Sequence, residues 1–381
     1  MKKEKKDKAI YRIEEEIARI DKKECRLFFY VLDTEGYASG SLAYEYQLAK
    51  IAQDAGYEVA MIYQTEEKGD EFVGVGGWLG ETYAQLPHYD IRKEDIDIRA
   101  SDVMFIPEIF AQVMNQTKKL PCKRIAIMQN FDYILSQTPF SAQWGDYGML
   151  DAITNTEENK QLLQGVFPYV KTTVIDPYID KMFGVTKKPK KCVVNVIARN
   201  PDDVTRLVKP FYWKYPLMKW LSFADLRGMN KEKFSDALRE GFLTIWIDRE
   251  SSFGYSAIEA MKCGNVVFAI MPDNQKKWMF DAEGKLNNSC IWFDNINQMH
   301  DKIAALVRAF VTDSIPDSVY AGQEEVKKMY SEEATKKQFL NYLKEVFKER
   351  KNVLLELKKI GEKQDQINVD NKEENKESDG K

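Results

Sequence analysis

The stretch that decides the fold covers residues 249–269 and reads "RESSFGYSAIEAMKCGNVVFA". It follows the apolar run "LTIWID", which has the composition of a buried strand, so the stretch begins at that strand's carboxyl end. Within it, "SAIEAMKCG" has helical spacing, with Ser256 as a good N-cap and Gly264 as a good C′ residue. "NVVFA" then starts another strand. This order of strand, turn, helix, glycine and strand indicates one unit of a parallel α/β sheet.

The same alternation extends in both directions from this stretch. Apolar strand-like runs before residue 178 are "CRLFFYVLD", "YEVAMIYQ", "DVMFIPEIF", "RIAIMQNF" and "DAITNT". After residue 190 they are "KCVVNVIARN", "FLTIWID", "NVVFAIMP" and "SCIWFDN". Because alternating strands and helices form parallel sheets with helices on both faces, we expect an α/β fold of two Rossmann-like, doubly wound domains facing a central cleft. Ligands of such sheets bind beyond the carboxyl ends of the strands.

The length of 381 residues suits two domains with extensions. We expect a charged helical arm (1–24), an N-terminal Rossmann-like domain (25–178), a linker (179–190), a C-terminal Rossmann-like domain (191–315), C-terminal helices (316–360) and a disordered tail (361–381). The arm has isoleucines three and four residues apart, which is helical spacing. The tail is polar and lacks aromatic residues, so it cannot bury a core.

The composition excludes several classes of function. The net charge of -4 predicts no broad attraction to nucleic acid or anionic lipid, although it is compatible with local basic patches. No stretch approaches the roughly 20 apolar residues of a membrane span. Five scattered cysteines without a CxxC pair indicate reduced thiols and a cytoplasmic location. The two histidines, His88 and His300, cannot form a histidine-rich zinc site, so we expect no metal and no resident cofactor.

The turn before "SAIEAMKCG" has the features of an anion site. The amide groups of Gly254, Tyr255 and Ser256 would point out of the helix N-terminus, where a diphosphate binds well. Glu259 would repel a phosphate, but it can accept hydrogen bonds from the vicinal hydroxyls of a ribose. A second explanation needs no ligand, because Ser256-x-x-Glu259 is also the pattern of a capping box. The sequence leaves both explanations open.

This stretch resembles the acidic motif of retaining glycosyltransferases with the GT-B fold, of the family 4 type. Their usual pattern is a Glu, seven residues, a second Glu, Ala-Met, and a Gly before a strand. "FGYSAIEAMKCGNVVFA" matches the second half of that motif. The first half departs from it, because Ser251 stands eight residues before Glu259 and Glu250 lies one residue earlier. The resemblance implies that Glu259 holds the nucleotide ribose and that Glu250 contacts the transferred sugar.

The resemblance extends over roughly residues 26–312. "DTEGYASGSLAYEYQLAKIAQDAGYEVAMIY" is similar to the opening strand, glycine-containing loop, helix and second strand of the family. "VVNVIARNPDDVTRLVKPF" is similar to the start of the second domain, where the family has an Arg and, six residues on, a Lys for the diphosphate; position 205 is a Thr here. The residues implied to bind the donor are Gly36, Gly40, Arg206, Lys209, Ser252, Gly254, Tyr255, Ser256 and Glu259, with Arg199 and Glu250 as the catalytic pair.

The function that this resemblance implies is retaining transfer of a hexose from a nucleoside diphosphate sugar to a hydroxyl acceptor, without a catalytic metal. Many members have a His near the reacting centre. Here His88 is the candidate in the first domain, and Gln129, Asn130 and Asp132 are alternatives that follow a buried strand. The aromatic residues of "FYWKYPLMKWLSF" are candidates for stacking on a base or sugar, or for core or interface packing.

Other functions remain open on the same fold. Ser251 in place of the first acid favours a catalytically silent GT-B protein that binds a nucleotide sugar or a protein partner. An epimerase or a phosphorylase is a further alternative. The sequence does not specify the sugar, the base or the acceptor.

Overall fold

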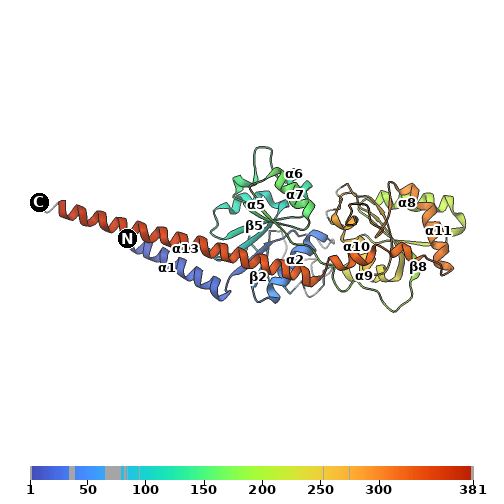
Figure 1. The fold of residues 1–381 in the computed structure, drawn as a ribbon, viewed down its shortest axis with the longest axis horizontal. Helices are drawn as coiled ribbons and strands as arrows, with labels where there is room; N and C mark the ends of the chain where they lie inside the picture. Colours follow the sequence, from blue (N-terminus) through green and yellow to red (C-terminus); the bar gives the residue numbers. More distant parts are fainter. Residues whose placement is uncertain are drawn as a thin grey trace.

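The computed structural model describes residues 2–33, 39–64, 79–80, 83, 85–93, 95–251, 253–273 and 275–378, and describes side chains from residue 12 to residue 363 within these ranges. They form two parallel sheets with helices on their faces, and a pair of long helices projects from one end (Figure 1). The α/β fold with two Rossmann-like sheets is therefore confirmed. None of the helices in the described ranges combines the length and the apolar composition that crossing a membrane requires.

The first sheet has seven parallel strands in the order β3-β2-β1-β4-β5-β6-β7. Their bounds are β1 Arg26–Tyr30, β2 Glu58–Tyr63, β3 His88–Asp90, β4 Val103–Pro107, β5 Lys123–Met128, β6 Asp151–Thr154 and β7 Lys171–Val174. The helices between them are α2 Gly40–Asp54, α5 Ala111–Gln116, α6 Phe131–Gln137 and α7 Glu157–Val166, with the short 3-10 helices η1 Glu108–Phe110, η2 Thr117–Lys119 and η3 Trp144–Tyr147. This sheet with its helices is called the first domain below.

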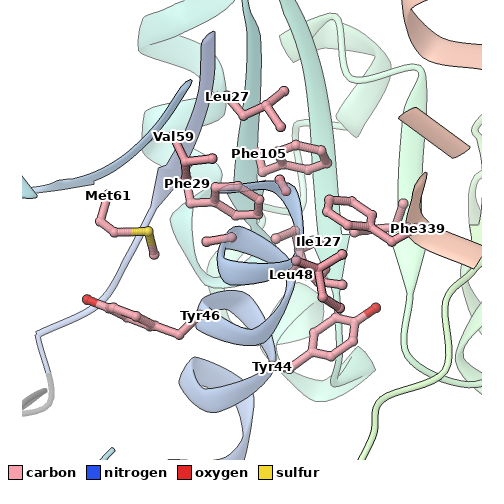
Figure 2. Close-up of a cluster of buried hydrophobic side chains, with 14 of the residues drawn as sticks. Leu27, Phe29, Tyr44, Tyr46, Leu48, Val59, Met61, Phe105, Ile127 and Phe339 are labelled. Carbon is pink, nitrogen blue, oxygen red and sulfur yellow. The ribbon is translucent and has the colours of Figure 1, made fainter. Parts of the chain in front are cut away.

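Alternate residues of each strand enter different cores, as the pleat of a strand requires. Phe29 of β1 lies in the core beneath α2, whereas its neighbour Phe28 lies in the core on the opposite face of the sheet. The Phe29 ring stacks on Phe105 of β4 with 4.6 Å between centroids (Figure 2). Both faces are buried, which explains why the strands are continuous apolar runs.

The second sheet has five parallel strands in the order β12-β11-β10-β8-β9. Its strands are β8 Lys191–Ala198, β9 Ser222–Asp225, β10 Gly241–Ile247, β11 Val266–Ile270 and β12 Ile291–Phe293. Its helices are α8 Pro201–Lys214, α9 Lys231–Glu240, α10 Tyr255–Lys262 and α11 Met299–Val311, with 3-10 helices η4 Pro216–Met218, η5 Lys277–Met279, η6 Ile296–Gln298 and η7 Asp317–Tyr320. This second domain is joined to the first through residues 175–190, which contain the expected linker.

The chain then returns to the first domain. After α12 (Gln323–Met329), the helix α13 (Glu332–Ser378) crosses to the first sheet and covers the same face as α2 (Figure 1). Phe339 of α13 is fully buried in that core, with its ring centroid 5.9 Å from that of Phe105 (Figure 2). The C-terminal helix therefore belongs to the core of the first domain, although it follows the second domain in sequence.

The charged arm is a helix, as expected. It forms α1 (Lys2–Lys22), which lies antiparallel to α13 (Figure 1). Ion pairs join the two helices at Lys358–Glu14, with 2.6 Å between nitrogen and oxygen, and at Lys351–Asp21, with 2.5 Å. Ile20 at the end of the arm packs against the core beneath α2.

The expectation of a disordered tail is wrong for residues 361–378, which continue α13. Their Lys, Glu and Gln residues are strong helix formers, and the segment contains no proline. Forming the first turn of a helix is unfavourable, whereas adding residues to an existing helix is not. Here the buried residues near Phe339 stabilise the helix, so the polar residues only have to extend it. A segment too polar to bury a core can therefore still extend a helix.

We predict that Phe339→Ala lowers the free energy of unfolding by about 3–5 kcal/mol, because it removes a buried ring from the first core. Urea denaturation measures the change. The matched control is Leu357→Ala on the same helix, where the side chain is 48% exposed and the loss should stay below about 1 kcal/mol. Equal losses in the two variants would show that α13 is not part of the core.

Candidate functional site

Helix α10 begins in the turn that the sequence singled out, and a glycine fixes its start. Gly254 is the N-cap, with a φ of +91° in the left-handed region that L side chains rarely adopt. A Cβ atom on Gly254 would also lie 2.9 Å from Trp278 Cζ2 and 3.2 Å from Trp246 Cη2. Both tryptophans are fully buried, so neither can move aside easily. The position of the helix N-terminus therefore depends on a residue without a side chain.

The capping box expected from Ser256 and Glu259 is wrong. Because Gly254 is the N-cap, Ser256 is already inside the first turn of α10, and none of the described side chains caps the helix. The left-handed backbone at Gly254 starts the helix earlier than a Ser256 cap would. The explanation of Glu259 that needed no ligand does not apply.

Glu259 is partly buried beside an ion pair between two other segments. Lys231 Nζ lies 3.1 Å from Asp180 Oδ2, and it also lies 5.5 Å from the ring centroid of Tyr83 in the first domain. Burial raises the pKa of Glu259 to about 7, the charge of Lys231 opposes that rise, and the charge of Asp180 adds to it. Glu259 therefore titrates near neutral pH, and it is placed to accept hydrogen bonds from hydroxyl groups.

The first domain meets this turn at the N-terminus of α2. Gly40 is the first residue of α2, and a Cβ atom on it would lie 2.9 Å from Cδ2 of Tyr255, the first residue of α10. The Tyr255 ring packs against the cores of both domains, and its hydroxyl has no hydrogen-bond partner among the described residues. Two helix N-termini, one from each sheet, thus meet at one point. Such ends carry unused amide groups and partial positive charge, so their junction suits an anion such as a diphosphate.

Arg199 follows β8 and is held by a carboxylate that sequence reasoning missed. Its Nε lies 3.0 Å from Asp248 Oδ1, and its Nη2 lies 3.3 Å from Asp248 Oδ2. Glu250 Oε2 lies 3.8 Å from Arg199 Nη1, and the Glu250 side chain is 70% exposed. Across the domain boundary, Tyr133 of α6 is close enough to Arg199 to interact electrostatically. The structure brings Arg199 and Glu250 together, and Asp248, directly after β10, orients the guanidinium group.

The other residues that the sequence predicted to bind the donor do not all lie near the junction of α2 and α10. Arg206 of α8 pairs with Asp203 at 3.4 Å, and Arg249 pairs with the same carboxylate at 3.2 Å. Lys209 is exposed. It lies two turns after Pro201 in α8, about 12 Å from the start of the helix. Gly36 and Ser252 lie outside the described residues.

A buried polar network lies at the carboxyl ends of the first-domain strands. Glu108 follows β4, and its Oε1 accepts hydrogen bonds from the backbone N–H groups of Gln129, at 3.0 Å, and Asn130, at 2.7 Å, which follow β5. Burial raises the pKa of Glu108 to about 7, although these two hydrogen bonds oppose the rise. Gln129 in turn donates from Nε2 to Glu45 Oε1 at 3.1 Å and to the Ser41 carbonyl oxygen at 3.0 Å. The network therefore ties the first turns of α2 to the ends of β4 and β5.

Lys276, after β11, is an unusual cation at the domain boundary, and no sequence pattern indicated it. Its side chain is buried, and its Nζ has no hydrogen-bond partner within the described part of the chain. Burial lowers the pKa of Lys276 to about 8, while the charges of Glu158 and Asp132 in the first domain raise it. The next residue, Lys277, donates its backbone N–H to Glu158 Oε1 at 2.7 Å. A buried ammonium group thus faces the first domain.

His88 lies far from this arrangement in the topology, because β3 is an edge strand of the first sheet. Its Nε2 lies 2.6 Å from the Tyr46 hydroxyl, and burial lowers its pKa to about 4. The imidazole is therefore neutral at ordinary pH. Its contacts explain it as a residue that packs β3 on α2.

A shallow, mostly apolar pocket of about 450 Å³ lies on the first domain beside the Lys277 contact. It is lined by Phe131, Glu158, Gln161, Leu162, Gly165 and Val166 of α6 and α7. Because Glu158 also accepts the bond from Lys277, the pocket opens next to the boundary between the domains.

No family model and no curated protein sequence matches the chain. Solved structures do match its fold. S. aureus TarM, in a crystal structure with fondaparinux, alpha-GlcNAc-glycerol and UDP, has a TM-score of 0.60 at 11% identity over 83% of this chain and 99% of that chain. Sucrose-phosphate synthase from Thermosynechococcus elongatus has a TM-score of 0.57 at 12% identity, over 85% of this chain and 99% of that chain. The pneumococcal O-GlcNAc transferase GtfA, in a crystal structure with UDP and GlcNAc, has a TM-score of 0.57 at 9% identity, over 86% of this chain and 99% of that chain.

The chain has the GT-B fold. The fold places the carboxyl ends of the two sheets opposite each other, which accounts for the contact between Gly40 and Tyr255.

We predict that Gly254→Ala lowers the free energy of unfolding by at least about 2 kcal/mol, because the new Cβ atom is strained at a φ of +91° and meets Trp278. The matched control is Gly165→Ala in α7, where a Cβ atom has no neighbour within 4 Å. That variant should gain about 0.5–1 kcal/mol from helix propensity. Denaturant titration of the three proteins decides, and an unchanged Gly254→Ala stability would contradict the geometry.

We predict that Glu259→Gln becomes more stable relative to the parent as the pH rises from about 5 to about 8. The folded pKa, about 7, is above the ordinary value of 4.5, so the folded state binds this proton more tightly than the unfolded state. The stability from that proton is present below the unfolded pKa and is lost as the pH rises through the folded pKa. Gln carries no such proton. Urea denaturation at both pH values measures the difference, and Glu325→Gln, on the exposed face of α12, is the control. A difference independent of pH would mean that Glu259 is ionised and well solvated.

Proposed function

We propose that the chain is a glycosyltransferase that binds a nucleoside diphosphate sugar between its two domains and transfers the hexose to a hydroxyl acceptor with retention. The observation that carries this proposal is the meeting of the N-termini of α2 and α10 at Gly40 and Tyr255, beside Glu259. The GT-B neighbours that were crystallised with UDP support a uridine nucleotide as the first donor to test.

In this proposal the diphosphate lies at the junction of the two helix N-termini. Negative charge grows on the leaving diphosphate as the glycosidic bond breaks. The amide groups of both helices and the Arg199 guanidinium group would stabilise that charge, and they need no reorganisation because Asp248 already orients Arg199. Such a reaction depends on leaving-group stabilisation, so it needs no metal and no resident cofactor beyond the donor itself.

Glu259 is proposed to accept hydrogen bonds from the ribose hydroxyls. Its neighbour Lys231 holds a positive charge nearby, which favours the ionised acid. Glu250, 3.8 Å from Arg199, is proposed to contact the transferred hexose. Its exposure in this arrangement means that the turn must tighten around the sugar.

The acceptor is proposed to approach from the first domain. The pocket between α6 and α7 lies next to the boundary and has an apolar lining with one carboxylate, Glu158. Such a lining suits an acceptor that offers a hydroxyl group on an otherwise apolar body.

Binding of the donor requires the two domains to move, because the Tyr255 ring lies directly against Gly40. Domain opening would separate the helix N-termini, and closure over the donor would exclude water from the diphosphate.

A catalytically silent protein that binds a nucleotide sugar or a protein partner is the second candidate. Ser251 at the position of the family's first acid and the high exposure of Glu250 favour it. Hydrolysis of the donor without acceptor separates the two: slow release of free sugar supports an enzyme, and binding without any release supports the silent protein.

The decisive test is donor binding by Glu259→Gln. Gln keeps the size and helix propensity of Glu, but it removes the charge that makes hydrogen bonds to the ribose about twice as strong. We predict that the affinity for the UDP-sugar that binds the parent falls more than about tenfold, or about 1.5–3 kcal/mol. Calorimetric titration measures this change.

Glu325→Gln should bind that donor like the parent, since it lies on the exposed face of α12. Unaltered affinity in Glu259→Gln, for every nucleotide sugar that binds the parent, would remove Glu259 from the site. It would also remove the main support for the enzyme.

A further inference from the structure

We propose that the turn at the end of α8 binds an anionic membrane surface. This turn exposes three large apolar side chains within eight residues: Trp213 at 77%, Leu217 at 91% and Trp220 at 56%. They lie in the last turn of α8, in η4 and just after it. The proposal is independent of the reaction proposed above.

The exposed side chains alternate along the turn with residues that pack inward. The inner face packs into the core of the second domain through Phe211, Tyr212, Tyr215, Met218 and Leu221. The two ends of the turn are joined, because the Tyr212 hydroxyl donates to the Leu221 carbonyl oxygen at 2.5 Å. Trp213, Leu217 and Trp220 lie between these two ends in the sequence, and all three are exposed.

The backbone of this turn is suited to an apolar environment. Part of its backbone is already hydrogen-bonded, with Met218 N–H donating to Tyr215 O at 2.9 Å and Leu221 N–H donating to Met218 O at 3.0 Å. Pro216 contributes no N–H donor. Side chains on such a turn can enter the interfacial region of a bilayer, and fewer backbone amide groups then need partners there.

The charge around the turn is complementary to anionic lipid. Residues 204–224 contain four basic residues and no acidic residue, in a chain with 56 basic and 60 acidic residues. Lys214 is neutralised by Asp301 of α11 at 2.5 Å, and Arg206 pairs with Asp203. Lys209 and Lys219 are exposed on either side of the apolar turn. Lys side chains beside interfacial Trp residues are a typical membrane-surface pattern, because their stems lie along the apolar region while the ammonium groups reach lipid phosphates.

The turn is positioned so that docking leaves the proposed donor site free. Helix α8 starts at Pro201, near Arg199, and runs about 20 Å to its end. In Figure 1, α8 and α11 lie at the outer end of the second domain, and α10 lies toward the first domain. A membrane at the end of α8 would therefore face away from the junction of α2 and α10.

Co-sedimentation of the full chain with vesicles tests this proposal. The vesicles contain equal parts of phosphatidylglycerol and phosphatidylcholine, or phosphatidylcholine alone. We expect binding to the anionic vesicles, reduced by high salt, and at least about tenfold weaker binding to phosphatidylcholine alone. The variant Trp213→Ser/Leu217→Ser/Trp220→Ser should lose at least about tenfold in binding to the anionic vesicles, and Lys209→Glu/Lys219→Glu should lose a similar amount.

The matched control is Leu135→Ser/Phe140→Ser, which removes two exposed apolar side chains of the first domain and should bind like the parent. Melting temperatures of all variants check the fold. The proposal is overturned if the parent does not bind anionic vesicles, or if a folded triple variant binds them as well as the parent. It is also overturned if the turn instead binds single-stranded nucleic acid, tested with an oligonucleotide, while vesicle binding is absent.

Discussion

The structure depends on one contact between its two sheets, the Tyr255 ring against Gly40. Each residue is the first of its helix, so this contact brings two sets of unused amide groups to the same place. It forms only because both neighbouring positions lack side chains: Gly40 leaves room for the ring, and Gly254 allows the left-handed turn that points Tyr255 across the boundary. The ring contributes to the cores of both domains, so stability and the shape of the site have the same origin.

Charged groups at this boundary are partly or fully removed from water. Lys276 is buried opposite Glu158 and Asp132 of the first domain, and Glu259 is partly buried beside Lys231. Burying a charge is costly unless a partner offsets the cost, and here several partners come from the other domain or from the segment between the domains. In the proposed function, an anionic donor would offset the cost of burying the cations Lys276 and Lys231, so its binding would be coupled to the way the two domains meet.

Much of the fold could be predicted from sequence, but only part of the site. Buried strands are local signals, so the run around Phe29 and the repeated alternation with helices indicated two parallel sheets. The motif and its resemblance pointed to Gly40 and Glu259, and the structure places Gly40 against Tyr255 of the same motif. Lys276 and Lys231 were missed, because their partners lie in other elements and no spacing reveals them. Ser256 was misjudged, since a nearby glycine with positive φ competes with a serine as the N-cap. The last part of α13 was misjudged because Lys, Glu and Gln are typical both of disorder and of solvated helix.

The central claim is that the N-termini of α2 and α10 together form an anion site for a diphosphate. Amide hydrogen exchange with and without UDP measures it most directly, because it reports on both helix ends in one experiment. The account predicts slower exchange at residues 40–41 and at residues 255–256 when UDP is bound, with little change in the first turn of α7. Protection at one helix end alone, or at neither while UDP is bound, would contradict it.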